Sequence, residues 1–120
     1  VPETKNLFNA DAFKQMKRTA YVVNTARGPI IDEAALAQAL DAGEIAGAAL
    51  DVMVQEPPGA THPLFGRDNV IITPHTSFYS EESLVELQTK AAQEVVAVVS
   101  GQAPRNPVNP DALKQVQSTK

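Results

Sequence analysis

The sequence predicts an α/β fold in which a parallel β-sheet is covered by helices on both faces. Three continuous apolar runs have the length of buried strands, at residues 20–25, 45–52 and 69–73. Continuous runs, rather than alternating ones, are typical of parallel strands. Helix-start signals precede the first run, separate it from the second and follow the third, and this alternation favours parallel pairing.

The first helix is predicted to begin after Asn9, whose side chain can cap it. Phe8 and Phe13 stand where a hydrophobic staple would place them. The helix should end near residues 17–18, where two cations suit the negative end of the helix dipole. The first strand follows at residues 20–25.

The second helix is predicted to begin after Asp32, with Glu33 in its first turn and Gly43 as its terminator. The second strand follows at residues 45–52. Residues 53–68 are rich in proline and glycine, which predicts an irregular loop rather than a helix. The apolar face of the second helix comprises Leu36, Ala39 and Leu40.

The third strand, residues 69–73, is stopped by Pro74, and a long helix is predicted over residues 80–100, capped by Ser80. Its apolar stripe is interpreted as core rather than as a cofactor contact. We expect residues 104–120 to form an extended tail. The stripe comprises Leu84, Leu87, Ala91, Val95, Val98 and Val99.

Composition excludes several classes of function. The 120 residues have a formal net charge of −4 and only 5% aromatic residues, which gives no footprint for nucleic-acid binding. No apolar run approaches the roughly 20 residues of a membrane span. The absence of cysteine excludes disulfides and thiolate metal sites, and no metal site is predicted. We expect a small-molecule or protein partner.

Polar residues stand at the end of each predicted strand: Arg27 after the first, Asp51 at the end of the second with Glu56 just beyond, and His75 after the third. The carboxyl ends of parallel strands meet at one edge, where α/β proteins bind ligands. Singly, each residue has an ordinary explanation, such as a surface ion pair or a turn. Their convergence favours a site. His62 has no evident companion and is interpreted as a loop residue.

These residue types fit one chemistry. An arginine fork can bind a carboxylate and orient the adjoining carbonyl. A histidine can give a proton to the carbonyl oxygen, and a nearby glutamate can hold the imidazole ring in position. None of these groups supplies a hydride, so the chemistry calls for a nicotinamide cofactor.

The segments VNTARGPIIDEAAL, GAALDV, QEPP, HPLF and NVIITPH, in this order, resemble the D-isomer-specific 2-hydroxyacid dehydrogenase family. That family includes phosphoglycerate dehydrogenases, glyoxylate and hydroxypyruvate reductases, and the C-terminal binding protein corepressors. The resemblance covers residues 2–110. It implies a Rossmann-like parallel-sheet layer, NAD or NADP as cofactor, a small 2-keto or 2-hydroxy acid as substrate, and a cytoplasmic homo-oligomer, expected to be a dimer.

Carried onto this sequence, the resemblance implies that Arg27 binds the substrate carboxylate. His75 would be the acid/base residue and Glu56 its partner. Asp51 would lie near the nicotinamide amide. The residues implied to bind the cofactor are Thr25, Ala26, Arg27, Asp51 and His75.

Two departures from the family pattern matter. After His75 the chain reads TSFYSEES instead of the glycine pair of many members. This segment is closer to the corepressor-like branch and to related bacterial dehydrogenases, and it implies a differently shaped pocket. The six glycines never form the G-x-G-x-x-G turn that holds a pyrophosphate. We therefore expect residues 1–103, including the long helix, to be the C-terminal half of a dinucleotide-binding domain from a longer enzyme, inactive when isolated.

Two alternatives stay open at this point. One is an NAD(H)-sensing, corepressor-like interaction protein that keeps the same residues. The other is a free-standing half-domain that acts as an oligomerisation module.

Overall fold

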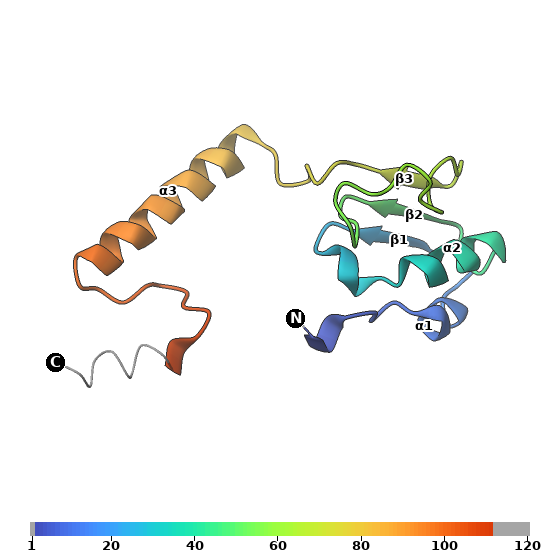
Figure 1. Ribbon diagram of the computed structural model, residues 1–120, viewed down its shortest axis with the longest axis horizontal. Coiled ribbons are helices and arrows are strands. Elements are labelled where there is room, and N and C mark those ends of the chain that lie inside the picture. Colours follow the sequence, from blue (N-terminus) through green and yellow to red (C-terminus); the bar gives the residue numbers. More distant parts are fainter. Residues whose placement is uncertain (1, 112–120) are drawn as a thin grey trace. The chain divides into compact units, whose positions relative to one another are not determined.

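The computed structural model describes residues 2–111, which divide into two compact units between Ser77 and Phe78 (Figure 1). We call residues 2–77 the sheet unit and residues 78–111 the helical unit. The expectation that residues 1–103 belong to a single domain stays a prediction.

The sheet unit contains three parallel strands in the order β1–β2–β3 (Figure 1). They are β1 (Tyr21–Asn24), β2 (Gly47–Leu50) and β3 (Val70–Ile72). In the register of the sheet, Leu50 stands opposite Asn24 on one side and Ile72 on the other. All three strands therefore end at one edge, and the predicted fold class is confirmed.

Two helices accompany the strands, α1 (Ala10–Lys14) and α2 (Glu33–Asp41). Their predicted caps are confirmed, because the Asn9 side chain accepts the Ala12 N–H and the Asp32 side chain accepts the Ala35 N–H, both at 3.0 Å. Helix α1 ends a few residues earlier than predicted. It fixes the fully buried Phe13 and then gives way to turns that lead the chain into β1.

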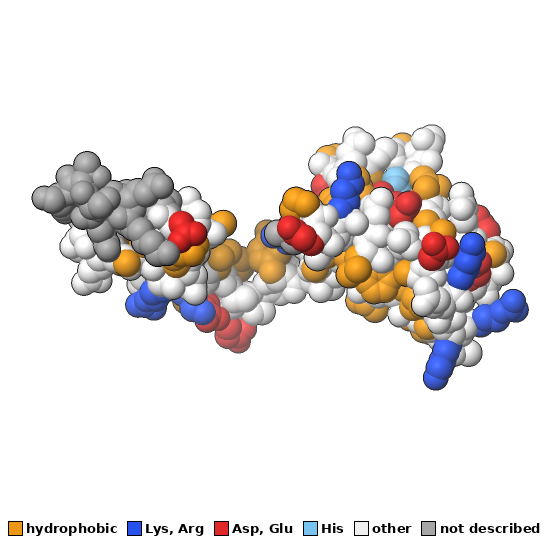
Figure 2. Space-filling model, turned by 90° about the horizontal axis from the view of Figure 1, so that it is seen from below, with side chains coloured by type: hydrophobic (Ala, Val, Ile, Leu, Met, Phe, Trp, Pro, Cys, Tyr) orange, Lys and Arg blue, Asp and Glu red, His pale blue; other side chains and the backbone are white. Residues whose placement is uncertain are grey.

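The core lies on one face of the sheet. Val22, Ala48 and Leu50 are buried there with residues of α1 and α2, which contact each other. On the opposite face, Tyr21 and Val23 are 70% and 68% exposed. Within the sheet unit no helix covers this face, because the β2–β3 connection contains none, and the prediction that helices cover both faces stays a prediction. Hydrophobic side chains consequently reach the surface (Figure 2).

The predicted irregular loop between β2 and β3 is confirmed, and it is fixed at several points. Leu64 is buried in the core. Arg67 donates to both carboxylate oxygens of Asp41 at the end of α2, at 2.5 and 3.1 Å, and to the Pro63 carbonyl at 2.8 Å. The loop therefore has a defined position although it has no regular secondary structure.

The helical unit consists of α3 (Glu81–Val99) and the residues around it. Ser80 caps α3 together with Ser83, as the sequence predicts. Within the helical unit no residue of α3 is buried, and the interpretation of its apolar stripe as core stays a prediction. A stripe becomes core only when another element covers it, and the described remainder of this unit is short and irregular.

After Gly101, which has a positive φ of 78°, the Arg105 N–H donates to the Glu94 carboxylate at 2.9 Å. Part of the predicted tail, residues 112–120, lies outside the described residues. No helix within residues 2–111 is long and apolar enough to cross a membrane.

Candidate active site

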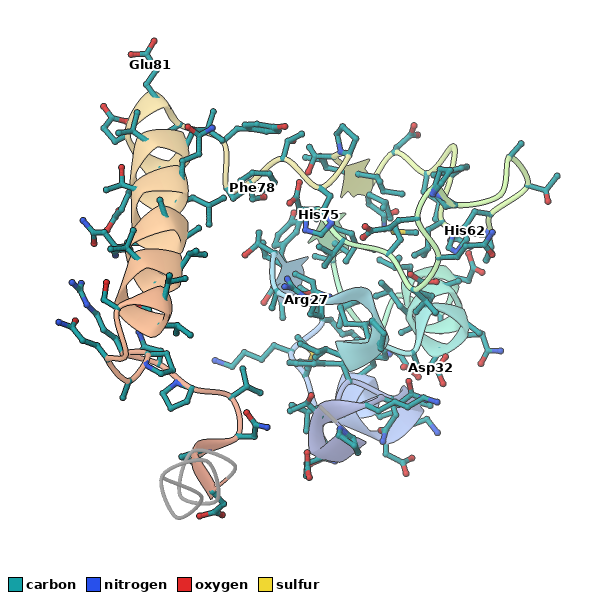
Figure 3. All side chains as sticks on the ribbon, turned by 60° about the vertical axis from the view of Figure 1, so that its left-hand side comes forward. Arg27, Asp32, His62, His75, Phe78 and Glu81 are labelled. Carbon is teal, nitrogen blue, oxygen red and sulfur yellow. The ribbon has the colours of Figure 1, made fainter. Side chains whose placement is uncertain are left out.

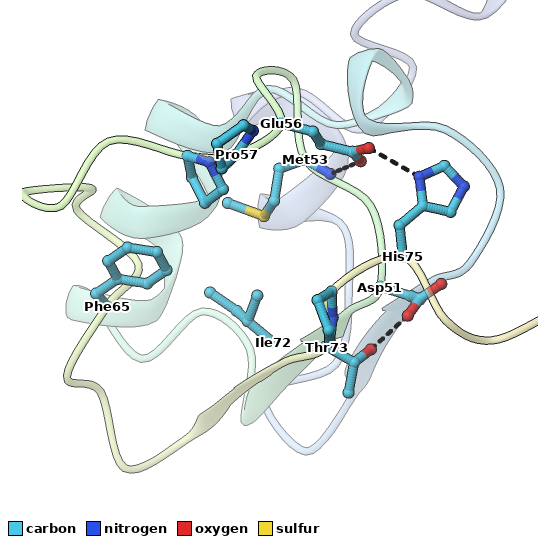
Figure 4. A pocket seen from close by; sticks show the side chains of 10 residues that line it. Asp51, Met53, Glu56, Pro57, Phe65, Ile72, Thr73 and His75 are labelled. Carbon is cyan, nitrogen blue, oxygen red and sulfur yellow. Dashed lines mark hydrogen bonds and ion pairs between the residues drawn. The ribbon is translucent and has the colours of Figure 1, made fainter.

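His75 and Glu56 form a hydrogen-bonded pair at the carboxyl edge of the sheet (Figure 4). Nδ1 of His75 lies 2.8 Å from Oε2 of Glu56, and the other carboxylate oxygen accepts the Met53 N–H at 2.8 Å. The bonds from His75 and Met53 hold the pKa of Glu56 below its ordinary value, so it is a carboxylate at neutral pH. The two side chains are 42% and 37% exposed, within reach of a ligand.

Asp51 anchors the turn on which His75 stands. Its buried carboxylate accepts the Thr73 hydroxyl at 2.6 Å and the Thr76 and Ser77 N–H groups at 2.8 and 2.9 Å. Burial alone would raise the pKa of Asp51, but these bonds outweigh it and hold the pKa far below its ordinary value. Asp51 is therefore a permanently charged acceptor for this turn.

The backbone of His75 needs such an anchor because its φ is 55°, in the left-handed region. A non-glycine residue there costs on the order of 1 kcal/mol and persists only when its surroundings hold it. The His75 N–H donates to the carbonyls of Asp51 and Thr73, at 2.9 and 3.0 Å. Asp51 thus fixes His75 through both its side chain and its main chain.

Arg27 leaves the same edge from the end of β1 (Figure 3). Buried Asn24 shapes this segment, since its amide accepts the Ala26 N–H and donates to the Arg27 carbonyl, both at 3.0 Å. The guanidinium donates to the Ala26 carbonyl at 2.6 Å and is exposed, as are Thr25 and Ala26. The structure therefore presents three of the predicted site residues on one exposed turn.

Gly28 brings that turn against the loop that carries Glu56. A Cβ atom at Gly28 would lie 2.1 Å from the carbonyl carbon and oxygen of Met53 and 2.4 Å from the nitrogen of Val54. The backbone segments of Arg27 and Glu56 can approach this closely only because residue 28 has no side chain.

Sequence reasoning missed the companion of His62. Its Nε2 lies 3.1 Å from Oε2 of Glu33, and Oε1 of Glu33 accepts the Val54 N–H at 2.7 Å. His62 is a loop residue, as predicted, but the interpretation that it has no companion is wrong. The two residues are separated by 29 positions, so no local pattern connects them. Asn24 was missed as well, because a lone asparagine in an apolar run carries no signal of its role.

A cavity of about 410 Å³ adjoins the His75–Glu56 pair (Figure 4). Its walls are mostly apolar, and the ionisable groups stand at its margin. Among residues 2–111, no three His, Cys, Asp or Glu side chains are arranged to hold a metal ion. The lining includes Met53, Glu56, Pro57, Phe65, Ile72 and His75.

Residues 1–77 match the family model described as D-isomer specific 2-hydroxyacid dehydrogenase, NAD binding domain. A glyoxylate reductase of Thermofilum pendens is 46% identical over 112 residues, which is 93% of this chain and 33% of the relative. A glycerate dehydrogenase of Methylorubrum extorquens is 46% identical over 109 residues, 89% of this chain and 34% of the relative. The chain thus spans about a third of the length of these curated relatives.

Solved structures are similar too. The NAD-complexed D-isomer specific 2-hydroxyacid dehydrogenase of Lactobacillus delbrueckii ssp. bulgaricus has a TM-score of 0.78 at 35% identity, over 90% of this chain and 37% of that one. The Xanthobacter autotrophicus Py2 enzyme in complex with NADPH and MES has a TM-score of 0.77 at 37% identity, over 93% and 46%.

Proposed function

Because this chain belongs to the D-isomer specific 2-hydroxyacid dehydrogenase family, within the NAD-binding domain, we propose that it is the C-terminal part of an NAD(P)-dependent enzyme. That enzyme would interconvert a small 2-keto acid and the corresponding 2-hydroxy acid. The observation that carries the proposal is the His75–Glu56 hydrogen bond at the carboxyl edge of a parallel sheet. Similarity to a glyoxylate reductase and a glycerate dehydrogenase supports the substrate class.

His75 is the proposed acid/base residue. When the keto acid is reduced, the ring gives its proton to the oxygen on C2, and it takes this proton back in the reverse direction. Glu56 accepts from Nδ1 and so directs Nε2 toward the substrate. Because the main chain of His75 is fixed by Asp51, the ring needs little reorganisation during the reaction.

Arg27 is proposed to bind the substrate carboxylate. Its planar guanidinium can donate two parallel hydrogen bonds, which fix both the position and the rotation of a carboxylate. The adjoining C2 carbonyl is thereby turned toward His75. The exposed guanidinium at the end of β1 supports this role.

The donor set of the chain fits the nicotinamide end of the cofactor and not the pyrophosphate. Exposed Thr25, Ala26 and Arg27 follow β1 at the same edge of the sheet as the end of β3, whereas the sequence has no glycine-rich phosphate turn. When bound, the cofactor supplies the hydride that reduces C2. We propose that these residues and Asp51 line the nicotinamide. The proposed cofactor is NAD or NADP, and the complete enzyme is proposed to be a cytoplasmic homodimer.

The experiment that tests this function uses the complete polypeptide encoded by the gene. It is assayed with NADH and with NADPH on a panel that includes glyoxylate, hydroxypyruvate and pyruvate. Turnover of at least one 2-keto acid supports the proposal. NAD-dependent oligomerisation without turnover would contradict it and would favour the corepressor-like sensor.

A further inference from the structure

We propose that Glu33 and His62 are positioning residues for the His75–Glu56 pair, because they fix the loop that carries Glu56. The expected effect on kcat rests on the proposed function. The positioning of Glu56 by Glu33 and His62 rests only on hydrogen bonds, so the positioning role and the proposed function can fail separately.

Two glutamates hold consecutive backbone N–H groups. Glu56 accepts the Met53 N–H at 2.8 Å, and Glu33, from the first turn of α2, accepts the Val54 N–H at 2.7 Å. The two successive peptide groups on either side of Met53 are therefore each bound by one glutamate. Because the Glu56 carboxylate bridges this segment and His75, the orientation of these peptide groups sets the orientation of the pair.

His62 completes the attachment in one defined tautomer. The Leu64 N–H points at Nδ1 at 3.3 Å, so Nδ1 accepts and Nε2 carries the hydrogen that Glu33 accepts at 3.1 Å. Both ring nitrogens are occupied by neighbours, and the side chains of His62 and Glu33 are only 16% and 14% exposed. This arrangement suits a fixed support and not a proton carrier.

The segment from residue 53 to residue 64 needs this support because it has no regular secondary structure. Its far end is held by the burial of Leu64, and its near end by Gly28, whose backbone touches Met53. Without the Glu33 carboxylate, the Val54 and His62 donors lose a shared acceptor, and the position of Glu56 is no longer fixed.

The same loop offers a matched control. Asp41, at the other end of α2, binds Arg67 and so fixes residues beyond Leu64. Asp41→Asn removes a charged attachment of this loop as Glu33→Gln does, but at a point remote in sequence from Glu56. A general loosening of the loop would affect both variants, whereas positioning of the pair would affect only one.

The structural test uses 15N-histidine labelling of the complete polypeptide, with His75→Gln to assign the His75 signals. In the wild type, we expect the His75 ring to hold its proton on Nδ1, facing Glu56. In Glu33→Gln and His62→Ala, we expect the His75 signals to move toward the Nε2–H tautomer. His62→Gln, which keeps a donor toward Glu33, should restore the wild-type signals in part, and Asp41→Asn should leave them unchanged.

The kinetic test uses the complete polypeptide. Glu33→Gln should lower kcat about tenfold with less than a twofold change in KM for the keto acid, and Asp41→Asn should change neither. Unchanged His75 signals in folded Glu33→Gln and His62→Ala would overturn the proposal, as would equal shifts in Asp41→Asn. Unfolding of both variants would also overturn it, because the support would then be general. Shifted signals in a polypeptide whose wild type shows no turnover would reject the proposed function and keep the positioning role.

Discussion

His75 and Glu56 are 19 positions apart in the sequence, yet Nδ1 of one lies 2.8 Å from Oε2 of the other. Each residue also has a separate anchor. The Asp51 carboxylate accepts hydrogen bonds from the turn that carries His75, and the Glu56 carboxylate accepts the Met53 N–H. Two independently anchored partners form a pair whose geometry is set before any ligand arrives, which is the condition for efficient proton transfer.

Arg27→Gln should raise KM for the keto acid strongly and leave KM for the nicotinamide cofactor nearly unchanged. Loss of a bidentate carboxylate contact costs roughly 2–4 kcal/mol. The measurement is steady-state kinetics of the complete polypeptide, with the exposed Arg18→Gln as the control. Wild-type kinetics on the keto acid in Arg27→Gln would remove Arg27 from its proposed role.

Asp51→Asn should destabilise the chain at neutral pH and flatten the pH dependence of its stability. The pKa of Asp51 is depressed in the folded state, so its contribution is present above the unfolded value of about 4 and is lost as the pH falls below it. Urea unfolding at pH 7 and at pH 3 measures this. The control is Asp68→Asn, at an exposed position of the loop. If Asp51→Asn and the wild type lost the same free energy of unfolding between pH 7 and pH 3, the prediction would be contradicted.

Gly28→Ala should destabilise the chain by about 1–3 kcal/mol and shift the amide signals of Met53 and Val54. The added Cβ would stand 2.1 Å from the Met53 carbonyl, which is backbone and cannot rotate away. Gly59→Ala is the matched control, because no atom lies within 4 Å of the Cβ position there and its φ is not positive. Equal stability of the two variants would show that the close approach is absent in solution.

The isolated 120-residue chain should reduce neither glyoxylate nor hydroxypyruvate with NADH or NADPH. The reason is that its sequence contains no G-x-G-x-x-G turn to hold the cofactor pyrophosphate. Absorbance of the reduced cofactor at high enzyme concentration measures this. Turnover by the isolated chain would contradict the prediction.

Much of the fold could be predicted from the sequence because its signals are local. The caps Asn9, Asp32 and Ser80 and the three apolar runs act within a few residues, and the structure confirms each of them. Which face of the sheet is covered could not be predicted, because that depends on where distant elements pack. What covers the stripe of α3 could not be predicted for the same reason: periodicity identifies an apolar face and does not identify its partner.

At the candidate site, the sequence could place residues at a common edge but could not predict their hydrogen bonds. The rule that parallel strands end together brought Glu56 and His75 into one hypothesis, and the structure places them in contact. The anchoring role of Asp51 depends on the conformation of the turn at residues 73–77. The Glu33–His62 contact depends on how the β2–β3 loop folds back onto α2. No sequence pattern predicts either arrangement. The catalytic and cofactor roles of the site residues stay predictions.

The most direct test of the central claim is single-turnover reduction of a 2-keto acid by the complete polypeptide and its His75→Ala variant, each saturated with reduced cofactor. Removal of the proposed proton donor should slow the reduction by roughly 10²–10⁴-fold while binding of the cofactor changes little. A His75→Ala variant that reduces the keto acid at the wild-type rate would contradict the account.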